Sequence, residues 1–158
     1  MLTKTRRERV RVDGARFAIV ASRYNPRYVD AMMNSATATL AKAGAKETLV
    51  IRVPGAFEIP VVAAELARKS PGPRIAAIIC LGVILRGETV HAAHIGEAVS
   101  QALMQIQVNT GVPVIHEVLL LENERQAQVR CLGKDPNRGT EAAHTALAMA
   151  ELMTKLRA

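Results

Sequence analysis

Tryptophan is absent from this 158-residue chain, and aromatic residues together make up only 3% of it. The four that occur, Phe17, Tyr24, Tyr28 and Phe57, all lie in the first 57 residues. Proteins that bind single-stranded nucleic acid place aromatic side chains among basic ones as stacking platforms. The scarcity of such platforms argues against that class of protein, although the formal net charge is +7.

Cysteines and long apolar runs are also scarce. Cys80 and Cys131 are too few and too far apart for a disulfide framework, so we expect structural thiols in a reducing cytoplasm. No apolar stretch reaches the roughly 18 residues that a membrane-spanning helix needs. The N-terminal segment is basic but lacks the apolar core of a secretory signal. We therefore expect a cytoplasmic protein that does not contact membranes.

Positive charge is concentrated at the N-terminus. Residues 1–15 contain five basic side chains and two acidic ones, so they contribute +3 of the +7. We interpret 1–15 as a solvated basic arm and 16–158 as one domain, because a chain of this length can bury one core but not two comfortable ones. The modest charge of the remainder favours an anionic small substrate over nucleic acid.

Short apolar segments alternate along the chain with segments of helical periodicity. Strands are predicted at 16–21, 47–53, 75–81 and 113–120, and helices at 26–43, 58–69, 91–110, 124–131 and 140–156. Asn25 is predicted to cap the first helix, with Pro26 at its first position. This alternation predicts a three-layer α/β/α sandwich around a four-stranded parallel sheet.

Ligands of such sheets bind beyond the carboxyl ends of the strands. The loop GVILRGETVH at 82–91 is the most informative one at that edge, because it leads into a helix whose free N–H groups form a seat for phosphate. Gly87 allows close approach of the backbone, Thr89 adds a hydroxyl donor, and His91 can transfer protons near neutral pH. A histidine at a helix start is more often a capping or surface residue. His94 lies three residues further on without an acidic or thiol partner, so we expect no metal site.

Several segments resemble the lumazine synthase family and occur in the same order: ASRYN (21–25), VPGAFEIP (53–60), GVILRGETVH (82–91), VPVI (112–115), ENERQA (122–127) and NRGTEAA (137–143). The similarity extends from about residue 15 to residue 156. It implies a flavodoxin-like fold and a cofactor-free transferase of riboflavin biosynthesis. That enzyme condenses 5-amino-6-(D-ribitylamino)uracil with 3,4-dihydroxy-2-butanone 4-phosphate to 6,7-dimethyl-8-ribityllumazine, phosphate and water.

The resemblance also implies a role for each residue of the site. Within one subunit, Tyr24 stacks on the pyrimidine, Ala56, Phe57 and Glu58 hold the ribityl chain, Val83, Ile84 and Leu85 line the uracil pocket, Glu88 and Thr89 bind the butanone phosphate, and His91 transfers protons. From the neighbouring subunit, His116 packs over the heterocycle and Arg130 pairs with phosphate, with Lys134 and Arg138 as helpers.

Family members assemble as homopentamers, some of which pack into an icosahedral shell, and riboflavin synthase is an implied partner. Strictly pentameric members often carry extra residues before the last helix. The loop GKDPNRG at 133–139 has no insertion, which favours the shell. Pro136 stands there in place of a usual glycine, and it restricts the backbone of this loop.

The sequence departs from the family at two places near the site. Ala92 and Ala93 stand where an aromatic residue and an acid usually follow the histidine, and His116 and Glu117 stand where Phe and Gly are common. These departures leave open a second hypothesis, a shell or scaffold protein that binds a flavin-like ligand without turnover. A third hypothesis, a nucleic-acid-binding module, depends on the basic arm alone.

Overall fold

The computed structural model describes residues 10–68 and 74–158. Two parts of the sequence-based predictions, namely 1–9 of the basic arm and Lys69 at the end of the second helix, lie outside the described residues. A single sheet of parallel strands has the order β2-β1-β3-β4. Its strands are β1 (Arg16–Ser22), β2 (Glu47–Val53), β3 (Ile75–Leu85) and β4 (Val114–Leu121).

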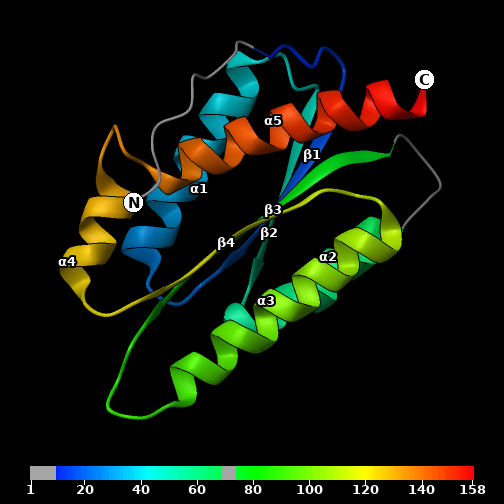
Figure 1. Ribbon diagram of the computed structural model, residues 1–158. Helices are drawn as coiled ribbons and strands as arrows, with labels where there is room; N and C mark the ends of the chain where they lie inside the picture. Colours follow the sequence, from blue (N-terminus) through cyan, green and yellow to red (C-terminus); the bar gives the residue numbers. More distant parts are fainter. Residues whose placement is uncertain (1–9, 69–73) are drawn as a thin grey trace.

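Two pairs of helices cover the two faces of the sheet (Figure 1). One face packs against α1 (Pro26–Lys42) and α5 (Arg138–Arg157), and the other packs against α2 (Ile59–Arg68) and α3 (His91–Thr110). Shorter elements are the 3-10 turn η1 (Ala56–Glu58), α4 (Glu124–Ala127) and the π-helical turn η2 (Gln128–Leu132). The predicted α/β/α sandwich is therefore confirmed.

The strand β1 shows how the two layers are specified. Phe17 and Ile19 belong to the core beneath α1 and α5, whereas Ala18 and Val20 belong to the core beneath α2 and α3. Successive side chains of a strand point to opposite faces, so a strand buried on both faces must be apolar throughout. This is why the continuous apolar runs in the sequence correctly predicted central strands.

The strand β3 is longer than predicted. It continues through 82–85 to end at Leu85, four residues beyond the predicted end. Gly82 does not form a turn: a Cβ at this position would lie 3.2 Å from Cγ1 of Val118 on β4, so glycine fits a tightly packed strand position. As a result Val83, Ile84 and Leu85 belong to the strand rather than to the following loop.

Two helix starts also differ from the predictions. Asn25 adopts a left-handed backbone (φ 53°) and its side chain does not cap α1. The helix α5 begins at Arg138, earlier than predicted, because the Asn137 side chain accepts hydrogen bonds from the backbone N–H groups of Gly139 and Thr140 at 2.9 and 3.2 Å. Such a side-chain cap satisfies the free donors of a helix start.

The segment before β1 is held against the domain by a hydrogen bond and by apolar packing. Val12, within the predicted arm, donates its N–H to the Ala43 carbonyl at 3.0 Å and packs against the core beneath α1 and α5.

Cys80 and Cys131 are both buried and free, in agreement with structural thiols. Within the described ranges, no helix is long and apolar enough to span a bilayer.

The contact between α1 and α5 depends on Gly139. A Cβ built on this residue would overlap the backbone carbonyl of Met32. We therefore expect Gly139→Ala to lower the free energy of unfolding by about 1–3 kcal/mol, the usual cost of overpacking a core. Denaturant unfolding of both proteins at equal concentration measures the difference.

Gly96→Ala provides the matched control for this substitution. Gly96 lies in α3, where a Cβ would meet only Leu120 at 3.8 Å, an ordinary contact. Alanine favours a helix over glycine by about 1 kcal/mol, so this variant should be as stable as the wild type or more so. Equal stability changes in the two variants would show that α1 and α5 can separate without cost.

Candidate active site

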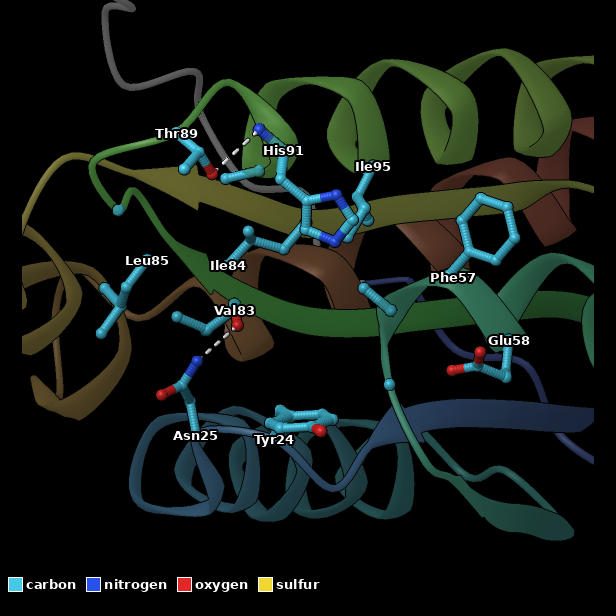
Figure 2. A pocket seen from close by; sticks show the side chains of 14 residues that line it. Tyr24, Asn25, Phe57, Glu58, Val83, Ile84, Leu85, Thr89, His91 and Ile95 are labelled. Carbon is cyan, nitrogen blue, oxygen red and sulfur yellow. Dashed lines mark hydrogen bonds between the residues drawn. The ribbon is translucent and has the colours of Figure 1, made fainter.

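A pocket of about 790 Å³ opens at the carboxyl ends of the strands (Figure 2). The parallel register brings these ends together, since Ser22 of β1 pairs with Val53 of β2, and Ala21 pairs with Leu81 of β3. The walls of the pocket are formed by the segments after β1 and β2, by the end of β3 and by the start of α3. The lining residues are Tyr24, Asn25, Gly55, Ala56, Phe57, Glu58, Val83, Ile84, Leu85, Gly87, Thr89, His91, Ala92 and Ile95.

Tyr24 forms the floor of the pocket in the view of Figure 2. The side chain of the next residue, Asn25, donates a hydrogen bond to the Val83 carbonyl at 2.7 Å, which ties the segment to β3. The Tyr24 ring lies so close to Gly55 that a Cβ there would be 3.3 Å from its Cδ2 atom. Tyr24 is nevertheless 72% exposed. It therefore presents a flat, supported aromatic surface to a ligand.

Phe57 and Glu58 enter from the turn η1, between β2 and α2. Both are exposed, and the Glu58 carboxylate folds back across Gly55, where Oε2 lies 3.0 Å from the position of a Cβ. A carboxylate accepts hydrogen bonds from hydroxyl groups. This corner of the pocket therefore combines an apolar ring with a strong acceptor, which suits a polyol chain.

His91 and Thr89 approach from the side opposite to Tyr24 (Figure 2). The helix α3 begins at His91, as predicted, and the Thr89 hydroxyl accepts the His91 backbone N–H at 3.4 Å. The histidine is exposed and its ring points into the pocket. A Cβ on Gly87 would meet no atom within 4 Å, so the space beside this backbone is open to a ligand.

The pocket contains a proton-transfer group but no fixed positive charge. Its ionisable lining residues are Tyr24, Glu58 and His91, and neither lysine nor arginine occurs among the lining residues of the described chain. Helix N–H groups alone carry only a partial positive charge. A phosphate dianion in this pocket would need a cation from elsewhere.

Five of the predicted site residues do not line this pocket. Glu88 lies exposed in the loop before α3. The other four, which the family resemblance assigns to a neighbouring subunit, belong to β4, η2, the loop after η2 and the start of α5: His116, Arg130, Lys134 and Arg138. Arg130 and Lys134 are exposed. The remaining predicted residues come together in the pocket.

Arg138 is held inside its own chain by two carboxylates. Its Nε donates to Glu117 at 2.9 Å and its Nη1 donates to Glu141 at 2.9 Å. Glu117 is only 7% exposed. Burial raises the pKa of the Glu117 carboxyl to about 7, and the nearby Arg138 opposes the rise. Arg138 therefore joins α5 to β4 in addition to any part in binding.

Sequence analysis did not identify Asn25, Gly55 and Ile95 as pocket residues. Asn25 was interpreted as a helix cap, although its position at the end of β1 is the place where ligands bind. Ile95 is partly buried against the core beneath α2 and α3, and it also lines the pocket. His91 and His94 have no further ligand nearby, and no group of three potential metal ligands occurs in the described residues.

Comparisons with known proteins agree with this geometry. The profile of the family described as 6,7-dimethyl-8-ribityllumazine synthase matches residues 14–154. The chain is 43% identical to the protein of that name from Xylella fastidiosa (strain 9a5c), over 93% of this chain and 95% of the relative. It is 43% identical to the one from Xanthomonas campestris pv. campestris (strain B100), over 90% and 92% of the two chains. Identity to the one from Stenotrophomonas maltophilia (strain R551-3) is 42%, over 91% and 92%.

The buried Glu117 generates a prediction for the pH dependence of stability. Its pKa is about 7 in the folded chain and near the ordinary 4.5 when unfolded, so between these values the folded state binds more protons. Stability should therefore fall as pH rises through this window. Between about pH 5 and about pH 8, the free energy of unfolding of Glu117→Gln should rise by about 1–3 kcal/mol relative to that of the wild type.

Urea unfolding at fixed protein concentration and several pH values measures this difference. The exposed Glu124, which starts α4, provides the control substitution Glu124→Gln, whose difference from the wild type should vary much less. A Glu117→Gln difference that stays constant from about pH 5 to about pH 8 would contradict the prediction, because it would show that Arg138 keeps the buried carboxylate ionised throughout this range.

Proposed function

The chain belongs to the 6,7-dimethyl-8-ribityllumazine synthase family, and we propose that the pocket in Figure 2 forms one half of its active site. The protein is a transferase of riboflavin biosynthesis. It condenses 5-amino-6-(D-ribitylamino)uracil with 3,4-dihydroxy-2-butanone 4-phosphate and releases phosphate and water. The proposals below concern which residues carry out this reaction and where they come from.

The pyrimidine substrate fits the inner part of the pocket. Tyr24 stacks on the ring, and the backbone at Val83, Ile84 and Leu85 binds the polar edge of the uracil. The ribityl hydroxyls donate to Glu58 beside Ala56 and Phe57. The exposure of Tyr24 and the position of the Glu58 carboxylate support this orientation.

The butanone phosphate is proposed to bind at the start of α3. Thr89 and the backbone beside Gly87 and Glu88 supply donors to the phosphate, as helix N-termini do in many proteins. His91 then lies within one helical turn of the phosphate. It can move protons as the amine attacks the ketone and as phosphate leaves. The open space beside Gly87 supports this placement.

The described residues that line the pocket include no lysine or arginine, and this observation carries the proposal of a shared site. A phosphate leaving group is best stabilised by guanidinium, which is always charged and binds oxyanions in a two-pronged manner. Arg130 is exposed on η2 and has no ion pair within the described part of the chain. We propose that Arg130 reaches the phosphate of the adjacent subunit, assisted by Lys134 and Arg138, while His116 packs over the heterocycle.

A shared site of this kind forms at every subunit boundary when a head-to-tail interface repeats around a closed ring. We propose a homopentamer, and an icosahedral shell built from pentamers because the loop 133–139 has no insertion. Association with riboflavin synthase, the consumer of the lumazine product, belongs to the same proposal. So does a cytoplasmic location, which the two free thiols Cys80 and Cys131 support.

Arg130→Ala tests the phosphate role. It should raise the KM for the butanone phosphate about ten- to a hundredfold, since charge-assisted hydrogen bonds contribute roughly 1.5–3 kcal/mol. The KM for the pyrimidine should hardly change, because only the other substrate carries a dianion. Lumazine fluorescence and phosphate release measure both constants. Arg125→Ala, which removes an exposed arginine of α4, should leave both constants unchanged. Equal losses for the two substrates in Arg130→Ala would contradict the assignment.

Mixed assemblies test whether the site is shared. His91→Ala should slow turnover by a factor on the order of tens, because positioning of two substrates carries much of the catalysis. When His91→Ala and Arg130→Ala chains are dissociated and reassembled together, about one interface in four regains both native residues. Activity should then exceed the mean of the two variants reassembled separately.

Two results would overturn this arrangement. Activity equal to the mean of the separate variants would place His91 and Arg130 in the same chain's site, and an active monomer would remove the need for a neighbour. Light scattering of the wild type distinguishes the two assemblies. A particle of pentamer mass at every concentration would exclude the shell.

A further inference from the structure

The His116 side chain, on the edge strand β4, forms hydrogen bonds at both ring nitrogens. The backbone N–H of Val118 donates to Nδ1 at 3.3 Å. On the other side of the ring, Nε2 lies 2.7 Å from the hydroxyl oxygen of Ser100 on α3. The same hydroxyl lies 2.7 Å from the carbonyl oxygen of Gly96. The histidine is thereby linked to both its own strand and the helix that covers it.

These contacts select one form of the imidazole. The Gly96 carbonyl can only accept, so the Ser100 hydroxyl donates its proton there and accepts from Nε2–H of His116. Nδ1 accepts from Val118 and therefore carries no proton. An imidazolium has protons on both nitrogens and could not accept that bond. Burial independently lowers the pKa of His116, which also favours the neutral ring.

Both ring nitrogens of His116 thus form hydrogen bonds within the chain, yet the residue remains exposed. What His116 can offer to another molecule is consequently the flat face of an uncharged ring. In that respect it resembles phenylalanine, the residue common at this position in the family. The hydrogen bonds supply the fixed orientation that an isolated histidine on a strand would lack.

We propose that Ser100 is a positioning residue for the pyrimidine substrate: its hydroxyl fixes the His116 ring as a neutral platform that packs over the heterocycle in the adjacent subunit. This inference rests on the proposed function, which places His116 at that subunit boundary. A ring that is already oriented loses little conformational freedom when substrate binds. Without the Ser100 hydroxyl, the imidazole can rotate about its side-chain bonds, and substrate binding must order it.

A double-mutant cycle with Ser100→Ala and His116→Phe isolates this role. In the native background, Ser100→Ala should raise the KM for the pyrimidine about fivefold, the factor that corresponds to one net hydrogen bond of about 1 kcal/mol. The KM for the butanone phosphate should not change. In the His116→Phe background the same substitution should have no effect, because phenylalanine has no nitrogen for Ser100 to hold. Ser100→Thr retains the hydroxyl and should restore the native KM.

Thr145→Ala is the matched control, since Thr145 donates to the carbonyl of Glu141 four residues earlier on α5, just as Ser100 does on α3. Its kinetic constants should be native. A fivefold effect of Ser100→Ala in both backgrounds would overturn the inference, because it would show that Ser100 acts through the helix. His116→Ala distinguishes an error in the placement of His116 from an error in the role of Ser100. If it leaves the pyrimidine KM unchanged, the proposed placement of His116 is wrong; if it raises that KM while Ser100→Ala does not, only the inference about Ser100 is wrong.

Discussion

The hydrogen bond from Asn25 to the Val83 carbonyl connects the core of the fold to its pocket. The strand β3 continues beyond the last residue with which β1 pairs, so the carbonyl of Val83 needs a donor from another segment. The Asn25 amide supplies it at 2.7 Å, and the backbone of Asn25 adopts a left-handed conformation there. Asparagine tolerates this conformation better than most residues. The same segment carries Tyr24, which remains exposed beside Gly55, so the hydrogen bond to Val83 helps to hold the aromatic surface of the pocket in place.

The sequence predicted the order and type of the main elements because apolar periodicity reports burial directly. It was less accurate wherever a residue has two possible uses. Gly82 resembled the end of a strand, but it is glycine because Val118 packs tightly against it. Asn25 resembled a helix cap, but its amide bonds to a strand far away in the sequence. Most of the residues that the family motifs predicted for one subunit lie together around the pocket. Contacts such as that between Arg138 and Glu117 join residues far apart in the chain, and no local pattern predicts them.

Charge is divided between two regions of the chain, and this division agrees with a site shared by neighbours. The pocket at the ends of β1, β2 and β3 holds Glu58 and His91. The cations that the sequence assigned to phosphate are on η2, the loop after it and the start of α5. Of these, Arg138 is already neutralised by carboxylates, which leaves Arg130 as the stronger candidate for an oxyanion partner. The resemblance implies the same order, with Arg130 as the phosphate partner and Arg138 as a helper, and the ion pairs within the chain give a physical reason for it.

The two departures on β4 act on opposite faces of the sheet. Neighbouring residues of a strand point in opposite directions; His116 therefore bonds to Ser100 of α3 and Glu117 to Arg138 of α5. Where the family commonly has a phenylalanine and a glycine, this chain has two polar side chains, each with a partner in a different helical layer. Glu117 is buried, and a buried polar group is tolerated only when it is paired, so Glu117 requires Arg138. His116 is exposed, and its hydrogen bond to Ser100 fixes the orientation of the ring. His116 and Glu117 thus connect the edge strand β4 to α3 on one face of the sheet and to α5 on the other, with a flat ring on the first side and a salt bridge on the second.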